Sequence, residues 1–191
     1  NLLFEVGRQW GGRGLDEWAS TCWVRAFHFP GPHRMHILNA VAGRMPAATL
    51  LELFKPQWDT LPGLWPSYRA AANEERNALL AYARQQAESE APAARPDKAL
   101  FIWHALAQMQ RDADASEAAI ASLIRACQAA PTDYSSRLWL GLELLEAGRL
   151  ADAEAQLRWC HDRRPGDRKV AEALATIARG RLAAADGAVP R

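Results

Sequence analysis

Apolar residues recur at intervals of three and four along most of this chain, which is the spacing of one face of an α-helix. The segment 137–165 shows the pattern most clearly and predicts two short helices joined by a tight turn. Each predicted helix has one apolar face, formed in the first by Leu140, Gly141 and Leu144 and in the second by Ala153, Leu157 and Cys160. The small residues Gly141 and Ala153 would let the two backbones approach closely. Pro165 ends the unit because proline cannot continue a helix.

The two-helix pattern recurs one interval of 34 residues earlier, where Pro131 corresponds to Pro165. Trp103 fills the first position of this earlier unit, where the later copy has Arg137. The apolar positions coincide as well, with Leu106, Ala107, Ala119 and Leu123 in place of Leu140, Gly141, Ala153 and Leu157. Recurrence at a fixed interval is the sequence signature of stacked repeats.

A third copy is indicated near the N-terminus. Gly7 and Gly14 have the same separation as Gly141 and Gly148 in the last copy. The apolar positions of the second helix then follow at the same offsets, with Ala19, Trp23 and Ala26 in place of Ala153, Leu157 and Cys160. Three copies in register favour a repeat protein over the alternative, an unrelated helical bundle.

The copies resemble the tetratricopeptide repeat (TPR), whose signature is W-x2-L-G-x2-Y followed by Gly, Ala, an aromatic residue or Leu, and Pro at fixed offsets. The resemblance implies an all-α fold of TPR-like antiparallel helix pairs, stacked in a right-handed superhelix whose first helices line a concave groove. A last helix, expected over 168–184, would cap the end of the stack with Val170, Leu174, Ile177 and Ala178. N-caps are predicted at Asn73, Asp97, Thr132 or Asp133, and Asp167, and capping is also expected of Asp112 and Asp114 in the middle turn.

The period breaks between residues 33 and 95. Helices are expected there over 33–44, 47–54 and 73–89. Three prolines within 56–66 allow only short turns of helix between bends. Trp58 and Trp65 lie in the same stretch, which predicts a packed connector and not a disordered linker.

The chain is therefore expected to have four parts. These are a first TPR-like helix pair at 1–32, an irregular Pro-rich helical connector at 33–95, TPR-like repeats with a capping helix at 96–185, and a frayed tail at 186–191.

Composition narrows the class of partner. Hydrophobic residues make up 49% and charged residues 24% of the 191, which is ordinary for a globular protein. The net charge of +1 supplies no field that would attract nucleic acid, so no nucleic-acid partner is predicted. No apolar run is long enough to cross a bilayer, so direct membrane insertion of this segment is not expected.

The resemblance also implies where a partner would bind. Carrying the groove positions of the family onto this sequence selects residues of the first helices and of the capping helix: Arg8, His104, Gln108, Arg111, Leu138, Leu142, Leu145, Glu146, Thr176 and Arg179. This mixture of charged, amide and aliphatic groups suits an extended peptide or protein partner. The family's carboxylate clamp of Lys, Arg and Asn is not found here, and the simpler alternative is a solvated face.

Candidate chemistry is thin elsewhere. Cys22, His28, His33 and His36 lack the tight pairs of a zinc site, so no metal is predicted. No nucleophile elbow or phosphate-binding loop is present, so we expect no cofactor and no catalytic residues. The sequence thus indicates a non-catalytic protein–protein interaction scaffold, and leaves homo-oligomerisation open.

A second resemblance concerns the setting of the chain. The order of one repeat, a Pro-marked short helix (ILNAVAGRMPAATLLELFKP) and further repeats is similar to the soluble tail of bacterial O-antigen ligase/polymerase-type membrane proteins. That would imply a domain of a polysaccharide-handling protein facing out of the cytoplasm; the other location is the cytoplasm. The chain begins with Asn1, which indicates a piece of a longer protein. A further alternative is an enzyme or glycan-binding module in which Trp58, Trp65 and the histidines near the connector form a sugar cleft.

Replacement of Ala153 by Leu tests the predicted contact between the paired helices. We expect the substitution to lower the free energy of unfolding by about 1–3 kcal/mol, because the larger side chain overpacks the interface. Chemical denaturation of the two proteins measures the difference, and an unchanged midpoint would mean that the helices do not touch at this position.

Overall fold

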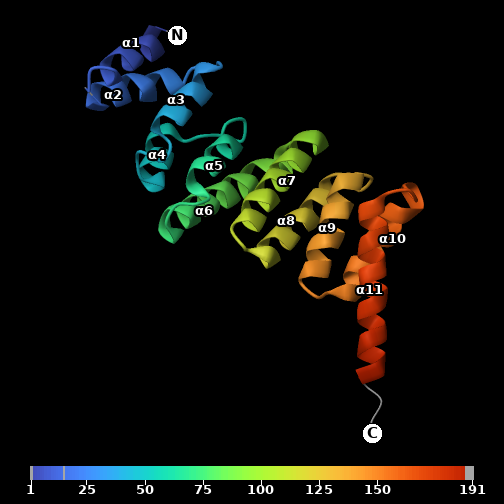
Figure 1. Cartoon of the computed structure of the whole chain (residues 1–191). Helices are drawn as coiled ribbons and strands as arrows, with labels where there is room; N and C mark the ends of the chain where they lie inside the picture. The colour runs from blue at the N-terminus through green and yellow to red at the C-terminus, as the bar shows by residue number, and fades with distance from the viewer. Residues whose placement is uncertain (1, 15, 188–191) are drawn as a thin grey trace. The chain divides into compact units, whose positions relative to one another are not determined.

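The computed structural model describes residues 2–14 and 16–187. Over these residues the fold is helical and contains no strand, only an isolated bridge between Ala42 and Met45 (Figure 1). The chain forms two compact units that divide between Ser89 and Glu90. The predicted all-α class is confirmed, whereas the finer four-part division and the superhelix stay predictions. The predicted tail falls largely on residues 188–191, which lie outside the described residues.

The first unit begins with a helix pair and continues with shorter elements. Its elements are α1 (Leu2–Gly11), α2 (Asp16–Phe27), α3 (His33–Val41), α4 (Ala47–Phe54), the 3-10 turn η1 (Leu61–Leu64), α5 (Trp65–Tyr68) and α6 (Asn73–Glu90). The helices α1 and α2 pack along their length, and α2 also contacts α3 and α4. The helix α3 is three residues shorter than predicted, because Ala42 is extended and Gly43 has a φ of 74°.

The prolines and aromatic residues of the connector build a core and not a linker. Phe27 and Phe54 meet edge to face with ring centroids 5.4 Å apart. Trp58 and Trp65 are 1% and 5% exposed, so both side chains are buried as the packed-connector prediction requires. Tyr68 donates its hydroxyl to the carbonyl of Met45 at 2.9 Å. The short elements are thus held in place by contacts between residues that are far apart in the sequence.

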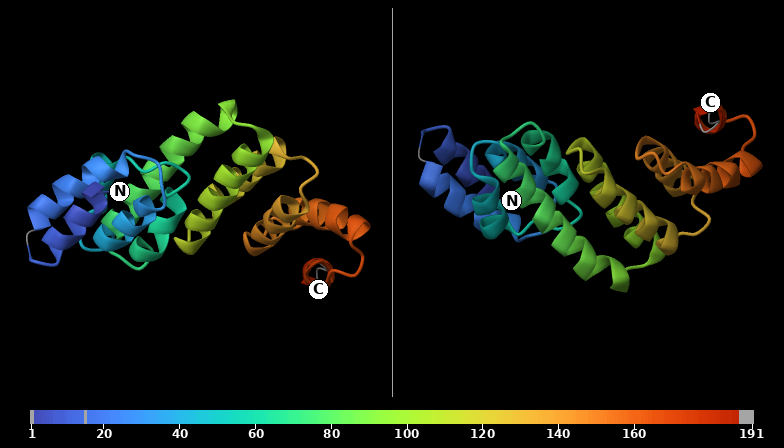
Figure 2. Two further views of the ribbon diagram at one scale, coloured as in Figure 1. Left: turned by 90° about the horizontal axis from the view of Figure 1, so that it is seen from above. Right: turned by 90° about the horizontal axis from the view of Figure 1, so that it is seen from below.

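The second unit is a series of packed helices. It contains the 3-10 turn η2 (Ala91–Ala93) and the helices α7 (Pro96–Asp112), α8 (Ser116–Ala129), α9 (Tyr134–Glu146), α10 (Leu150–Arg163) and α11 (Arg168–Gly187). Close packing joins α7 to α8, α8 to α9, α9 to α10 and α10 to α11, and Figure 2 shows these neighbours side by side. Their apolar faces form one core, to which each large buried side chain contributes about 1.5–3 kcal/mol.

The same small-to-large contact recurs in the helix pairs. A side chain added at Gly141 would have its Cβ 2.8 Å from Cγ of Leu157, and one added at Gly7 would overlap the indole ring of Trp23. Leu157 and Trp23 occupy the same position of the repeat, so the two glycines lie in equivalent environments. Ala107 at the corresponding position of the middle pair is 2% exposed. The repeat register read from the sequence is confirmed.

The turns within the pairs are equivalent as well. Gly14, Asp114 and Gly148 have φ values of 74°, 58° and 74°, and each donates its backbone N–H to a carbonyl three residues earlier at 2.9–3.0 Å. The left-handed region is open to glycine and tolerated by aspartate. Asp114 is therefore not a cap as predicted, because the cap position of α8 is Ala115.

Two predicted N-caps are confirmed. Asp133 accepts the N–H of Ser136 at 2.7 Å, and Asp167, one repeat interval later, accepts the N–H of Lys169 at 2.9 Å. The prediction for Asp97 is wrong, because α7 already begins at Pro96, which suits the first position of a helix. Asp97 instead forms an ion pair with Arg95 at 2.8 Å.

Replacement of Gly148 by Ala isolates the conformational demand of the turn. Nothing lies within 4 Å of a Cβ at this position, so only the positive φ opposes the new side chain. We expect the free energy of unfolding to fall by about 1–2 kcal/mol. The control is Gly166→Ala, which also enters open space but at a position without positive φ, and it should stay within about 0.5 kcal/mol of the parent protein. Equal effects of the two substitutions in denaturant titrations would contradict the assignment.

Candidate protein-binding surface

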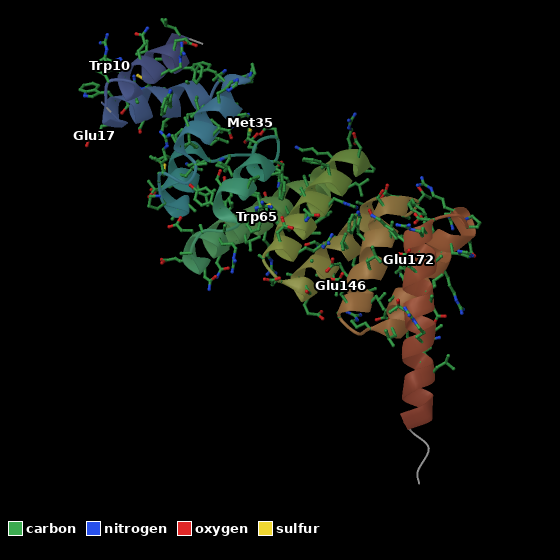
Figure 3. The ribbon with its side chains drawn as sticks, in the orientation of Figure 1. Trp10, Glu17, Met35, Trp65, Glu146 and Glu172 are labelled. Carbon is green, nitrogen blue, oxygen red and sulfur yellow. The ribbon has the colours of Figure 1, made fainter. Side chains whose placement is uncertain are left out.

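The groove residues predicted from the sequence fall on both units. Arg8 lies on α1 in the first unit, and the others lie on first helices α7 and α9 and on α11 in the second unit. We call the exposed side of α7 and α9 the first-helix face. It is formed by Phe101, His104, Gln108, Arg111, Leu138, Leu142, Leu145 and Glu146. The last of these is labelled in Figure 3, as is Glu172 on α11.

Arg111 links the two helices of this face. Its Nε lies 2.5 Å from Oε1 of Glu143 on α9, and its guanidinium stacks 4.5 Å from the ring centroid of Trp139. The ammonium of Lys169 on α11 lies 5.9 Å from the same ring. One aromatic ring on α9 is therefore contacted by cations from both neighbouring first helices, an attraction that strengthens when partly shielded from water.

Glu143 is a carboxylate inside the fold. Its side chain is 3% exposed and its ion pair with Arg111 is the interaction that compensates for the lost hydration. Burial raises the pKa of Glu143, and Arg111 opposes that rise. Removing the arginine would leave a buried and unpaired charge, so Arg111 has a structural role whatever else it binds.

His104 joins α7 to the beginning of α9. Its Nε2 lies 2.7 Å from Oγ of Ser136, and that hydroxyl donates to Oδ2 of Asp133 at 2.8 Å. The hydroxyl of Ser136 donates its proton to the carboxylate of Asp133. In the hydrogen bond with His104 the hydroxyl oxygen is therefore the acceptor and Nε2 is the donor, so the histidine cannot accept the proton of Ser136. Ser136 is also fully buried. A histidine, a serine and an aspartate meet here without the order that activates a nucleophile, in which the histidine lies between the other two.

The apolar part of the first-helix face comes from both helices. Phe101 on α7 is 51% exposed, and Leu138, Leu142 and Leu145 on α9 are half-buried against the core of the second unit. Phe101 precedes His104 by three residues and therefore lies on the same side of α7. The face thus includes an exposed aromatic ring on α7 and partly covered aliphatic side chains on α9.

The remaining predicted groove residues make fewer contacts with neighbouring helices than His104 and Arg111 do. Gln108 donates to Asp112 at 2.7 Å along the exposed side of α7, and Glu146 is exposed at the end of α9. Arg179 donates to Thr176 on its own helix at 3.2 Å. The structure therefore brings His104 and Arg111 into contact with α9, whereas Lys169 is the residue of α11 that reaches Trp139.

Sequence reasoning missed Phe101 on this face and two residues of α9 that hold Arg111 in place beside it. Phe101 is exposed, whereas Trp139 and Glu143 contact Arg111 from α9, and none of the three stands at a signature position of the repeat. The spacing of Trp139 and Glu143, four apart on α9, was a usable signal, because an arginine from the neighbouring helix can contact both. Phe101 was detectable as an aromatic residue at helical spacing from His104.

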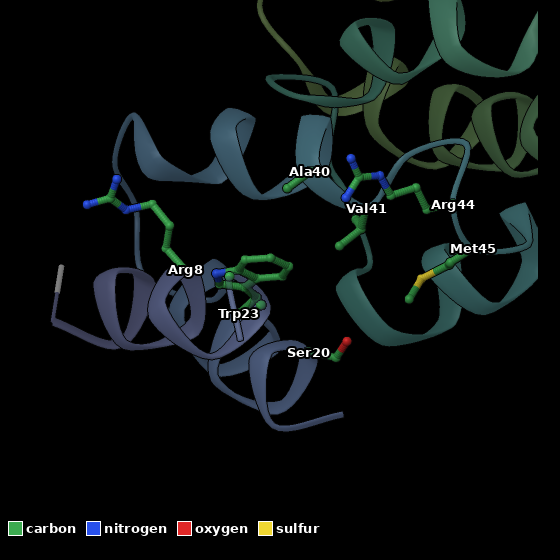
Figure 4. Close-up of a pocket in the computed structure, with 9 residues that line it drawn as sticks. Arg8, Ser20, Trp23, Ala40, Val41, Arg44 and Met45 are labelled. Carbon is green, nitrogen blue, oxygen red and sulfur yellow. The ribbon is translucent and has the colours of Figure 1, made fainter. Parts of the chain in front are cut away.

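Arg8 lies beside a cavity that is confined to the first unit (Figure 4). The cavity has a volume of about 470 Å³ and is lined by residues of α1, α2, the end of α3 and the turn that follows it. The guanidinium of Arg8 forms an ion pair with Glu5 on the same helix at 2.8 Å. Arg8 thus belongs to the first unit, whereas the first-helix face belongs to the second.

The remaining candidates for chemistry have structural surroundings. Within residues 2–14 and 16–187, no group of three His, Cys, Asp or Glu side chains is arranged to hold a metal ion. Burial raises the pKa of the Cys160 thiol to about 11, so it stays protonated at neutral pH. No helix in the described part of the chain is long and apolar enough to cross a bilayer. The near-complete burial of Trp58 and Trp65 removes the stacking surfaces that the glycan-binding alternative needs.

Comparison with known proteins identifies the fold alone. No family model and no curated protein sequence matches this chain. A TPR-repeat chain from the structure titled "Crystal structure of APC/C hetero-tetramer Cut9-Hcn1" is similar, with a TM-score of 0.54, 13% sequence identity and coverage of 92% of this chain. The chain spans about a third of that protein, 35% of its length. Together with the recurring helix pairs, this likeness shows an all-α, TPR-like helical repeat fold.

The pH dependence of stability tests the placement of His104. Burial lowers the pKa of His104 from its ordinary value near 6.5, and Asp133 offsets this only in part. The unfolded chain therefore binds a proton at a pH where the folded chain does not, and this contribution to stability is lost as the pH falls below 6.5 towards the lowered pKa. We expect the stability advantage of the parent protein over His104→Gln, about 0.5–1.5 kcal/mol at pH 8, to shrink by pH 5.

Urea titrations of both proteins at the two pH values measure this change, and an NMR titration of the ring gives the pKa directly. A gap that is constant with pH, or a ring that titrates above 6.5, would contradict the buried environment assigned to His104.

Proposed function

We infer that this chain is a non-catalytic interaction module that binds a protein or peptide partner on the first-helix face. The observation that carries the proposal is the combination of an exposed Phe101 with half-buried Leu138 and Leu142 among amide and charged groups. Binding energy at protein interfaces is concentrated in a few buried aromatic and apolar side chains with polar groups around them. The TPR-like fold supports the same class of function, because the similar chain comes from the structure of a hetero-tetramer, Cut9-Hcn1.

The contacts within the face indicate which residues are available to a partner. Arg111 is already paired with Glu143, and His104 is already hydrogen-bonded to Ser136. A partner would therefore find Phe101, Gln108 and Glu146 accessible, with the leucines as an apolar floor. The expected occupant is an extended or helical segment with apolar side chains and a basic group that can approach Glu146.

The resemblance to the soluble tail of O-antigen ligase-type proteins has no support from the comparisons. No observation in the described residues favours a polysaccharide ligand. Membership of a cell-envelope protein therefore stays an alternative setting for the same interaction module.

A peptide display screen against the purified chain tests the proposal. Selected peptides are titrated against the parent protein, a face variant and a control variant. The face variant is Phe101→Ala with Glu146→Lys, and the control is Ile124→Ala with Asp162→Lys on the second helices α8 and α10. All four side chains are exposed, so both variants should fold, and each pair removes one apolar group and reverses one charge. Arg111 is left intact because its loss would strand the buried Glu143.

We expect the face variant to weaken peptide binding at least about tenfold and the control variant to leave it unchanged. Circular dichroism checks that both variants keep their helical content. Selected peptides that bind the face variant as tightly as the parent protein would remove this face from consideration.

A further inference from the structure

The cavity of the first unit is lined by the turn after α3 as well as by the helix pair α1 and α2. It is walled by Ser20 and Trp23 from α2, Val41 from the end of α3, and Arg44 and Met45 from the following turn (Figure 4). One edge of Trp23 packs on Gly7, and its Nε1 donates to the carbonyl of Phe4 at 3.3 Å, which holds the ring as a fixed wall. The volume of about 470 Å³ lies within the range of pockets that bind small molecules.

Arg44 is the available cation at this cavity. The other arginine in the lining, Arg8, has its guanidinium paired with Glu5. Arg44 makes no side-chain hydrogen bond or ion pair with the residues that the structure describes, and it is exposed. A guanidinium presents paired N–H donors that match a carboxylate, so an occupant with one negative charge next to the apolar walls would be complementary.

The turn that carries Arg44 is held in place from both sides. Gly43 adopts a φ of 74°, and the N–H groups of Ala42 and Arg44 donate to the carbonyls of Leu38 and Val41 at 2.7 and 3.1 Å. The hydroxyl of the buried Tyr68 fixes the carbonyl of the next residue, Met45. A backbone that is already ordered loses little entropy when a ligand binds. The free energy of the contact with Arg44 is therefore not offset by the ordering of its turn.

Side-chain polar groups beside the apolar walls distinguish between kinds of occupant. Gly11 and Gly12 line the cavity without side chains, and the N–H of Gly12 and the carbonyl of Gly11 are already hydrogen-bonded to Arg8 and Gly14 at 3.0 Å. The hydroxyl of Ser20 on α2 and the guanidinium of Arg44 are the polar side-chain groups of the lining that remain for an occupant. A simple hydrocarbon chain cannot pair with them, whereas a peptide can.

We propose that this cavity binds a peptide segment in which a bulky apolar side chain is adjacent to an acidic residue. The apolar side chain fits between Trp23, Val41 and Met45, and the carboxylate pairs with Arg44. This proposal rests on the proposed function in one respect, namely that the ligand is part of a protein. The cavity belongs to the first unit and shares no residue with the first-helix face.

Defined peptides test this site. The probes are acetylated and amidated hexapeptides, Ac-Gly-Ser-Glu-Leu-Ser-Gly-NH2 and its Phe and Ala relatives at the Leu position, each with a counterpart carrying Gln for Glu. Binding is followed by amide and indole shifts in NMR spectra. We expect the Glu–Leu and Glu–Phe peptides to bind about tenfold more tightly than their Gln counterparts, and to shift Gly11, Gly12 and the indole N–H of Trp23.

The matched variants are Arg44→Gln and Arg69→Gln. Both residues are exposed arginines of the first unit, and Arg69 does not line the cavity. Arg44→Gln should abolish the preference for Glu over Gln, and Arg69→Gln should retain it. The proposal is overturned by an undiminished preference in Arg44→Gln, by shifts that map outside the cavity, by the absence of peptide binding, or by decanoate binding more tightly than every peptide. None of these results depends on the first-helix face, which has its own test.

Discussion

The structure depends on the close approach of the two helices in each pair. That approach requires a residue with little or no side chain on the first helix opposite a large residue on the second. Gly141 faces Leu157 and Gly7 faces Trp23, and in both pairs a Cβ on the first helix would overlap its partner. Since the facing residues are separated by the same number of positions, one steric condition sets the register of both pairs.

The hydrogen bonds of the backbone reinforce that register. A residue with positive φ reverses the chain within each of the three pairs, and an aspartate satisfies free N–H groups at the beginning of α9 and of α11. The hydroxyl of Tyr134 donates to Asp167 at 2.6 Å, which connects the start of α9 to the cap of α11. The caps thus also join successive repeats of the second unit.

Polar side chains perform a similar task between the first helices. The contacts of His104 with Ser136 and of Arg111 with Glu143 bridge α7 and α9. Residues that the repeat pattern assigns to partner binding are therefore partly engaged within the fold. This shifts the expected binding energy from charged groups to Phe101 and the aliphatic strip of α9, where removal of water from apolar surface is the driving force.

Sequence alone determined the features that depend on local spacing. The helix pairs, the small residues at their contacts, and the caps at Asp133 and Asp167 follow from a pattern repeated at a fixed interval, because each unit must satisfy the same packing and hydrogen-bonding conditions. The sequence predicts that Trp58 and Trp65 are packed in the connector, but it does not predict which residues pack against them.

Tertiary structure decided the features that depend on residues brought together without a fixed interval. The pairing of Arg111 with Glu143 and the cavity beside Arg44 both result from contacts between different elements. A periodic pattern shows which side of a helix is buried. It does not show which polar group from another helix will reach that side, since this depends on the distances between helices in the folded chain.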